Sequence, residues 1–314
     1  MPNIITEQKL EEEALNMLKD EGWEYLYGPE IAPAPEGNNE RKSYKEVVLI
    51  ERLKKAIAKI NPKIPEEARE EALKKVLRHE SQDLVSNNKS FHKLLFDGVD
   101  IEYRKEWRII GDKVWLIDFQ NIDNNEFLAI NQFTIVENEY NRRPDILLFI
   151  NGLPLILFEL KNPADEKATT KDAFDQIETY KKQISSLFRY NEIVILSDGS
   201  ETLAGTISSE TDRFIAWKTI NGKYQEKSEI ELLIKGMLNK ETILDILRNF
   251  IVFQEEKDTK LNITKISKKL AAYHQYNAVN KALENTIKAT KGDKRAGIVW
   301  HTQGSGKSLT MVFY

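Results

Sequence analysis

The sequence predicts an α/β fold, because segments with helical periodicity alternate with short apolar runs of strand length. In the first quarter of the chain, apolar residues recur every three or four positions, which is typical of amphipathic helices. From Trp107 onward, apolar residues instead form short runs bounded by Gly, Asn and Asp. A chain of 314 residues, 41% of them hydrophobic, can bury a core and indicates about two domains.

Start and stop signals bound the helices expected before the strands. The first helix runs from Thr6 to near Gly22, the second from the capping-box spacing Ser43-x-x-Glu46 to Asn61-Pro62, and the third starts at Pro65. The stretch Gly28–Gly37, which carries Pro and Gly, is expected to be a loop.

The middle of the chain has strand character, and helices return after it. The expected strands are Trp107–Ile110, Val114–Phe119, Phe127–Val136, Asp145–Ile150, Leu155–Leu160, Ile193–Leu196, Leu203–Ile207, Phe214–Lys218 and Ala296–Trp300. The expected helices are Ala173–Phe188, Ser228–Leu238, Lys240–Phe253 and Ile266–Ala289. The polar, charged run Glu255–Asn262 is the expected boundary between two domains.

Composition excludes several classes of protein. The absence of Cys excludes disulfide scaffolds, thiolate zinc sites and a cysteine nucleophile, and it fits a cytoplasmic protein. No apolar run is long enough for a transmembrane helix, and the acidic N-terminus does not resemble a secretory signal. Because the net charge is −4, any DNA-binding surface must be a local basic patch.

A predicted hairpin brings charged side chains together. Two apolar strands flank Asn151-Gly152, a typical hairpin turn. Asp145 begins the first strand, whereas Glu159 and Lys161 end the second. A two-residue loop would place Asp145 and Glu159 on opposite faces of the sheet. We therefore expect a three-residue loop, or a bulge that restores the same parity, so that both carboxylates and Lys161 share one face.

Two converging carboxylates repel each other unless a hard cation lies between them. Mg²⁺ binds through one or two carboxylates plus phosphate, and a neighbouring lysine can stabilise charge on the phosphate. Asp145 and Glu159 are the expected metal ligands. An acidic-x-Lys triplet is a weak signal by itself, because it also occurs in polar surroundings such as Glu7–Lys9. The alternative is an ordinary salt-bridged sheet end.

The following helix carries Gln176 and Tyr180 on one face. Asp145, Glu159-x-Lys161 and Gln176-x-x-x-Tyr180, in that order, resemble the PD-(D/E)xK nuclease superfamily with a Q-x-x-x-Y motif. The wider sequence resembles the R (restriction) subunit of type I restriction enzymes over essentially the whole chain. This resemblance is carried by Asn61-Pro62, Asn131–Phe133, Arg143–Asp145, Asn151–Leu155 and Glu159–Asn162.

A second motif lies at the C-terminal end. A short apolar segment leads into Gly304-Ser305-Gly306-Lys307-Ser308, a phosphate-binding loop in which Lys307 reaches phosphates and Ser308 ligates Mg²⁺. His301 replaces the first glycine of the strict motif, as superfamily 2 helicase motors tolerate. The helix around Gln275 resembles the Q-motif of such motors, where the glutamine reads the adenine edge.

The resemblance implies a mixed sheet flanked by helices at 1–250, followed at 251–314 by a linker and the start of a RecA-like motor. It implies an endonuclease that uses Mg²⁺ to cut double-stranded DNA, joined in the full protein to ATP-driven translocation. Its partners would be methyltransferase and specificity subunits, and the motor would be incomplete in this chain. Two alternatives remain: a helicase whose nuclease-like domain only binds DNA, and a nuclease–motor fusion outside restriction.

Overall fold

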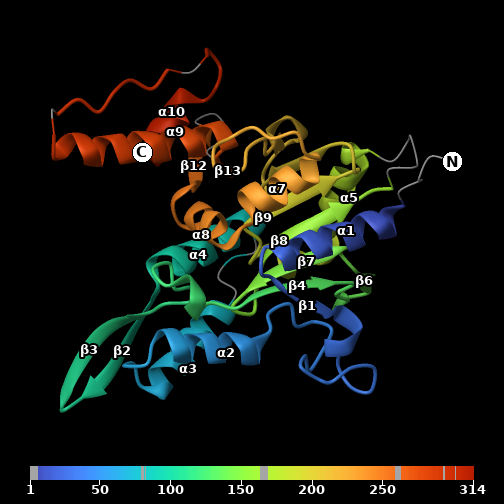
Figure 1. Ribbon diagram of the computed structural model, residues 1–314. Coiled ribbons are helices and arrows are strands. Elements are labelled where there is room, and N and C mark those ends of the chain that lie inside the picture. The colour runs from blue at the N-terminus through green and yellow to red at the C-terminus, as the bar shows by residue number, and fades with distance from the viewer. Residues whose placement is uncertain are drawn as a thin grey trace.

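A mixed seven-stranded sheet forms the centre of the molecule (Figure 1). The computed structural model describes residues 6–78, 81, 83–162, 169–258, 263–292, 294–300 and 302–314. In spatial order the strands of this sheet are β1 (Glu24–Tyr27), β4 (Phe127–Asn131), β7 (Ile146–Ile150), β8 (Leu153–Leu160), β9 (Ile193–Ser197), β10 (Thr202–Gly205) and β11 (Ile215–Ala216). The β1–β4 and β8–β9 pairs are parallel and the other pairs antiparallel, so the predicted mixed sheet is confirmed.

The helices pack around this sheet, except the last two, which lie at one end of the molecule (Figure 1). The helices are α1 (Glu7–Asp20), α2 (Ile50–Ile60), α3 (Glu66–Leu77), α4 (Leu84–Asp97), α5 (Thr170–Gln183), α6 (Ser185–Phe188), α7 (Glu229–Met237), α8 (Lys240–Asn249), α9 (Tyr273–Thr290) and α10 (Lys307–Phe313). Helices α1 and α7 lie side by side, while α5 packs against β8 and β9. No helix among the described residues is both long and apolar enough to cross a membrane.

Three two-stranded hairpins extend from this body. They are β2 (Val99–Lys105) with β3 (Arg108–Val114), β5 (Ile135–Glu137) with β6 (Tyr140–Arg142), and β12 (Ile251–Asp258) with β13 (Ile263–Leu270). The β2–β3 hairpin projects from one end of the molecule, and α9 and α10 lie at the other (Figure 1).

The central strands follow directly from their composition. Every residue of β7, β8 and β9 is buried, as expected for nearly continuous apolar runs that are covered on both faces. Glu159 is the exception in β8, because it is a charged residue within an otherwise apolar strand and is only 3% exposed. A buried carboxylate at this position needs a chemical explanation.

The N-terminal expectations are partly confirmed. Thr6 caps α1, its side chain accepting from the backbone N–H of Lys9. The second helix, however, starts at Ile50 rather than after a capping box at Ser43. Leu49 N–H donates to the carbonyl of Gly152, so Val47–Leu49 pack as extended chain in the core. The carboxylate of Glu46 accepts from Lys42 N–H instead of capping a helix.

Several strand expectations need correction. The predicted strand Trp107–Ile110 is confirmed from Arg108 onward as the start of β3, but β3 pairs only with β2, outside the central sheet. Of the predicted strand Val114–Phe119, only Val114 lies in a strand. The predicted strand Phe127–Val136 is broken after Asn131, because Gln132 adopts a positive φ of 55°. Ala296–Trp300 forms no strand, since no described strand lies beside it to share hydrogen bonds.

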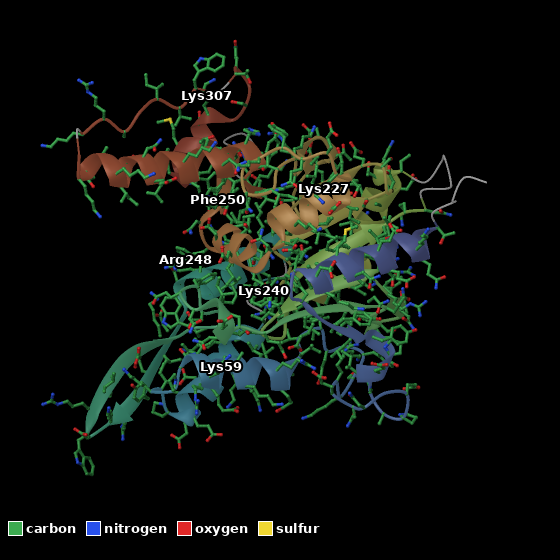
Figure 2. The ribbon with its side chains drawn as sticks, viewed as in Figure 1. Lys59, Lys227, Lys240, Arg248, Phe250 and Lys307 are labelled. Atoms are coloured by element: carbon green, nitrogen blue, oxygen red, sulfur yellow. The ribbon has the colours of Figure 1, made fainter. Side chains whose placement is uncertain are left out.

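The C-terminal third differs most from expectation. Helix α8 ends at Asn249 rather than Phe253, and the predicted helix from Ile266 begins only at Tyr273. The intervening chain is the β12–β13 hairpin. Phe250, labelled in Figure 2, lies at this joint. The centroid of its ring lies 4.7 Å from that of Tyr276 on α9 and 5.6 Å from that of Phe313 on α10. The domain boundary at 250/251 stays a prediction.

Candidate active site

The turn between β7 and β8 is held by the core. Asn151 and Gly152 both have positive φ, 54° and 80°, as a tight hairpin turn of this kind requires. The Asn151 side chain is fully buried, donating to the carbonyl of Leu116 and accepting from Glu126 N–H. A Cβ on Gly152 would lie 2.5 Å from the Leu49 carbonyl oxygen, so this position requires glycine.

A bulge fixes the register of the hairpin. Ile150 pairs with Leu153, which makes the loop two residues long, but the register shifts by one residue between Leu148 and Phe149. Pro154 lies in this irregular stretch, where its missing N–H is tolerated. Beyond the bulge Ile146 pairs with Phe158, so the same register places Asp145 opposite Glu159. The predicted parity-restoring bulge is confirmed.

The predicted charged residues therefore meet at one end of the hairpin. Lys161 Nζ lies 2.7 Å from Glu159 Oε1. Leu160 N–H donates to Asp145 Oδ2 at 2.6 Å, and the backbone N–H of Lys161 donates to the Ser197 carbonyl on β9. Glu159 Oε2 is buried and has no hydrogen-bond partner among the described residues. One oxygen of the site is thus left for a further ligand.

The ammonium of Lys161 does not fully offset the burial of the two carboxyls and the repulsion between them. Burial raises the pKa of Asp145 strongly, and the nearby Glu159 raises it further. Burial also raises the pKa of Glu159, and Lys161 offsets only part of this effect. Although burial lowers the pKa of Lys161, Glu159 more than restores it, so the ammonium stays charged.

Helix α5 contributes Tyr180 and Gln176. Tyr180 is 5% exposed, and its pKa is raised by burial and by the negative charges of Glu159 and Asp145. Its hydroxyl lies close enough to Glu159 to lower the pKa of that carboxyl. Half-buried Gln176 in turn lies close enough to Tyr180 to lower the pKa of its hydroxyl. The structure therefore brings Tyr180 to the carboxylates and places Gln176 behind it.

A neighbouring acid was not expected from the sequence. Glu7, in the first turn of α1, raises the pKa of both Asp145 and Glu159 by its charge. One turn further on, Glu11 accepts from Asn131 Nδ2 at 2.5 Å. Only the packing of α1 near the end of β8 brings Glu7 to the site, so local sequence carried no signal for it.

The donor set fits a hard divalent cation bound through few protein ligands. Asp145 and Glu159 supply carboxylate oxygens, the ligand type that Mg²⁺ prefers. The unpartnered Glu159 Oε2 and the raised pKa of both carboxyls are what a cation would relieve. The described residues contain no group of three or more His, Cys, Asp or Glu suited to a metal, so water and phosphate would complete the coordination.

The predicted phosphate-binding loop lies at the other end of the molecule, where Figure 2 labels Lys307. Gly304 and Gly306 have positive φ, and α10 begins at Lys307, directly after Gly306. Lys307 Nζ donates to the carbonyl of Thr302 within the loop at 3.0 Å. Ser308 is exposed, and the Ser305 hydroxyl is buried without a partner among the described residues. His301 lies outside the described residues.

Gln275 binds this loop directly. Its Oε1 accepts from Ala272 N–H at 2.9 Å, and its Nε2 donates to the Gly306 carbonyl at 3.1 Å. Both ends of the amide are thus engaged by backbone, and the side chain is 4% exposed. A hollow of about 390 Å³ lies beside the loop, lined by Gln275, Gly304 and Gly306 together with Arg213.

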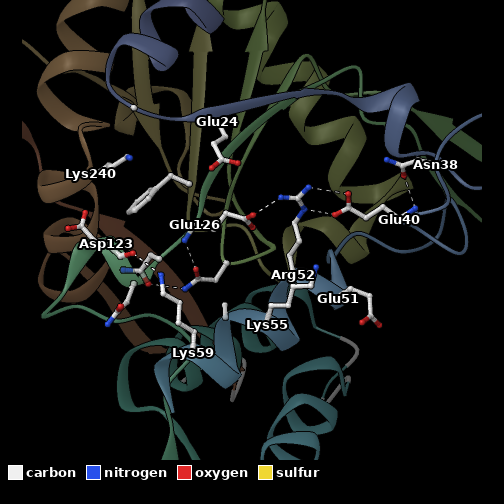
Figure 3. A pocket seen from close by; sticks show the side chains of 16 residues that line it. Glu24, Asn38, Glu40, Glu51, Arg52, Lys55, Lys59, Asp123, Glu126 and Lys240 are labelled. Atoms are coloured by element: carbon white, nitrogen blue, oxygen red, sulfur yellow. Dashed lines mark hydrogen bonds and ion pairs between the residues drawn. The ribbon is translucent and has the colours of Figure 1, made fainter. Parts of the chain in front are cut away.

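A separate hollow of about 790 Å³ lies beside α2 and the edge of the sheet (Figure 3). Arg52 points into it and forms ion pairs with both Glu40 and Glu126. Lys59, Lys240, Glu24 and Asp123 also line this hollow, so residues of both charge signs surround it. None of the predicted site residues lines it, and the site at Asp145 and Glu159 is distinct from it.

Comparison with known proteins places these features in context. A family model described as "Type I restriction enzyme R protein N terminus" matches residues 4–213, and a SWI2/SNF2 ATPase model matches residues 274–314. The chain is 42% identical, over 99% of its length, to the type I restriction enzyme HindI endonuclease subunit of Haemophilus influenzae. It is 36% identical, over 97% of its length, to a putative type I restriction enzyme endonuclease subunit, MjaIXP, of Methanocaldococcus jannaschii. It spans 30% of the length of each.

Proposed function

We propose, since the chain belongs to the R protein family of type I restriction enzymes, that its sheet domain carries the endonuclease site of a DNA-cutting subunit. One observation carries the proposal: Asp145 and Glu159 converge beside Lys161, and one oxygen of Glu159 is buried without a partner. An ordinary salt-bridged sheet end would pair one acid with one base and would not leave a second buried carboxyl with a raised pKa beside the pair.

Asp145 and Glu159 would hold Mg²⁺ between them. When bound, this ion would polarise a DNA phosphate and lower the pKa of an attacking water. Lys161, held by Glu159, presents its ammonium where negative charge develops on the phosphate. Tyr180, with Gln176 behind it, orients the Glu159 carboxylate, and the apolar body of β8 excludes bulk water from its buried side.

The C-terminal segment supports a second part of the proposal. Gly304 and Gly306 have positive φ directly ahead of α10, and residues 274–314 match a SWI2/SNF2 ATPase model, which supports an ATP-phosphate cradle at Gly304–Ser308. We therefore infer that the full protein couples cutting of double-stranded DNA to ATP-driven translocation. Assembly with methyltransferase and specificity subunits would supply sequence recognition, so this subunit would read no sequence itself.

The test is cleavage of a supercoiled plasmid by the full-length protein, assembled with its partner subunits, with and without Mg²⁺. Glu159→Gln keeps the shape of the side chain and removes its negative charge. We expect it to lower cleavage by several orders of magnitude, because a metal ligand is lost. Asp175→Asn, on the exposed face of α5, is the matched control and should cut normally. Cleavage by Glu159→Gln at the unmutated rate would refute the assignment.

A further inference from the structure

The β2–β3 hairpin is a long, largely unsupported ribbon. It projects away from the sheet and from α9 and α10 (Figure 1), and seven-residue strands give it a reach of about 23 Å. Its base is anchored, because Val99, Ile101 and Val114 are buried in the core. Its distal half is exposed, and Trp107 at the tip has a relative exposure of 103%.

Charge is segregated along this ribbon. The distal half carries Arg104, Lys105 and Arg108 against a single acid, Glu106. Among the described residues, the side chains of these three cations have no hydrogen bond or ion pair. At the base the balance reverses, and Lys113 is paired with Asp100 at 3.2 Å. Although the whole chain has a net charge of −4, the distal ribbon is locally cationic.

The tip does not have the residues that its fold alone would favour. Lys105 lies directly opposite Arg108 in the ladder, and like charges at such positions destabilise a hairpin. The two turn residues, Glu106 and Trp107, have φ of 49° and 69°, a conformation that costs least for Gly or Asn and more for a bulky side chain. An external anion placed between Lys105 and Arg108 would remove the repulsion.

We propose that the distal half of this ribbon, which we call the DNA arm (residues 103–110), contacts the sugar–phosphate backbone of duplex DNA. A two-stranded ribbon fits the major groove, where its cations meet phosphates on the flanking strands. Trp107 then lies against sugars or base edges in the groove. This inference rests on the proposed function, because that function requires the chain to meet DNA. The contact site that it assigns is distinct from Asp145 and Glu159.

Charge favours DNA over a protein partner. A protein-docking surface of this size would be built around an apolar core, with charged residues depleted from its centre. Here Trp107 and Ile109 are the exposed apolar residues, and they are interleaved with three unpaired cations. Protein–DNA interfaces, by contrast, are polar and strongly cationic.

The test is the affinity of the 314-residue chain for a short labelled DNA duplex, measured by fluorescence anisotropy over a range of salt concentrations. The triple variant Arg104→Ala/Lys105→Ala/Arg108→Ala should bind at least ~10-fold more weakly at low salt. Its slope of log affinity against log salt should be shallower by about 2 to 3, because each lost phosphate contact removes roughly one unit. The single variant Trp107→Ala should weaken binding without changing that slope.

The matched control removes three exposed cations elsewhere, Lys42→Ala/Lys45→Ala/Lys63→Ala, which lower the net charge equally. It should bind within about twofold of the unmutated chain. Equal losses in both triple variants would overturn the proposal, because binding would then follow total charge. Circular dichroism of each variant identifies any loss of fold.

Other outcomes also separate this inference from the nuclease proposal. Unchanged DNA affinity in the arm variant, or no DNA binding by the unmutated chain, refutes the arm and leaves the Glu159 cleavage test standing. Unchanged DNA affinity with lost assembly onto the methyltransferase and specificity subunits would instead make the ribbon a protein-docking element, which also overturns the proposal. Cleavage by Glu159→Gln at the unmutated rate, together with the expected loss of DNA affinity in the arm variant, would refute only the nuclease site.

Discussion

Lys268 and Glu192 form an ion pair that is fully withdrawn from solvent, with Lys268 Nζ 2.5 Å from Glu192 Oε2. Lys268 lies on β13, whereas Glu192 immediately precedes β9 of the central sheet. The ammonium also donates to Asn88 Oδ1 and to the Asn191 carbonyl, and His92 contacts the same Glu192 oxygen at 2.8 Å. This buried cation thus joins the β12–β13 hairpin, which leads to α9, to the sheet domain, and the Thr206 and Ser208 side chains bond its backbone as well.

Replacing this cation should destabilise the fold. Lys268→Met leaves Glu192 buried without its main partner, a loss of about 3–5 kcal/mol by precedent for broken buried pairs. Because Lys268 and His92 hold the pKa of Glu192 below its ordinary value despite burial, removing Lys268 should raise it. Chemical denaturation measures the loss. The neighbouring Lys269→Met should change stability little, and adding Glu192→Gln to Lys268→Met should recover part of the loss.

The metal-free carboxyl pair should make stability fall with pH. The pKa of Asp145 and Glu159 is raised in the folded state, so folding favours their protonated forms. This contribution is complete below the ordinary carboxyl pKa near 4 and is lost as pH rises through the raised values. With a chelator present, Asp145→Asn should therefore gain stability relative to the unmutated chain from acid to alkaline pH. If the difference in unfolding free energy between Asp145→Asn and the unmutated chain stayed constant across pH, the raised pKa of the buried carboxyl pair would be contradicted.

The central sheet and its site were largely predictable. The apolar runs of β7, β8 and β9 predicted buried strands, and period-two alternation with a three-residue loop or a parity-restoring bulge predicted that Asp145 and Glu159 share a face. The position of the bulge was not predictable. A two-residue loop combined with a bulge places Asp145 and Glu159 on the same face, just as a three-residue loop would. Tertiary packing alone brings Glu7 beside the pair.

The β12–β13 hairpin shows why other parts were missed. Ile266 and Leu270 are four residues apart, a spacing that also fits a helix, and one serine and two lysines fill the positions between them. What decides the strand is Lys268, whose side chain enters a buried network more than sixty residues away in sequence. In the same way, the ribbon at 99–114 pairs with itself instead of the sheet, which alternation alone cannot distinguish.

Magnesium should stabilise the chain through the same two carboxylates. A cation that binds only the folded state raises the melting temperature as its concentration increases. We expect Mg²⁺ to raise the melting temperature of the unmutated chain and to have little effect on Asp145→Asn/Glu159→Gln. Asp175→Asn should respond as the unmutated chain does. An equal rise in all three variants would place the ion elsewhere.

Gln275 should position the phosphate-binding loop. Its amide joins Ala272 N–H to the Gly306 carbonyl, and a Cβ on Gly306 would lie 2.6 Å from Gln275 Nε2. Gln275→Ala removes both hydrogen bonds and should weaken nucleotide binding by the full-length protein about tenfold, equivalent to about 1.4 kcal/mol. Asn277→Ala, two residues along α9, is the control. Titration with a fluorescent ATP analogue measures the change, and unaltered affinity would show that the loop holds its shape without Gln275.

Cutting and translocation should separate by mutation in the assembled full-length protein. Lys161→Ala keeps both carboxylates but removes the ammonium 2.7 Å from Glu159, a loss of order 10²–10³ in cleavage rate by analogy with removed transition-state donors. It leaves Gly304–Ser308 untouched, so ATP hydrolysis should continue at the unmutated rate. Lys307→Ala should do the reverse, abolishing ATP hydrolysis and, with it, any cleavage that depends on translocation. ATPase and plasmid-cleavage rates measured side by side decide the matter. If Lys161→Ala lost both activities equally, a lowered melting temperature would indicate a folding defect, whereas a normal melting temperature would show that the two sites are coupled and contradict their separation.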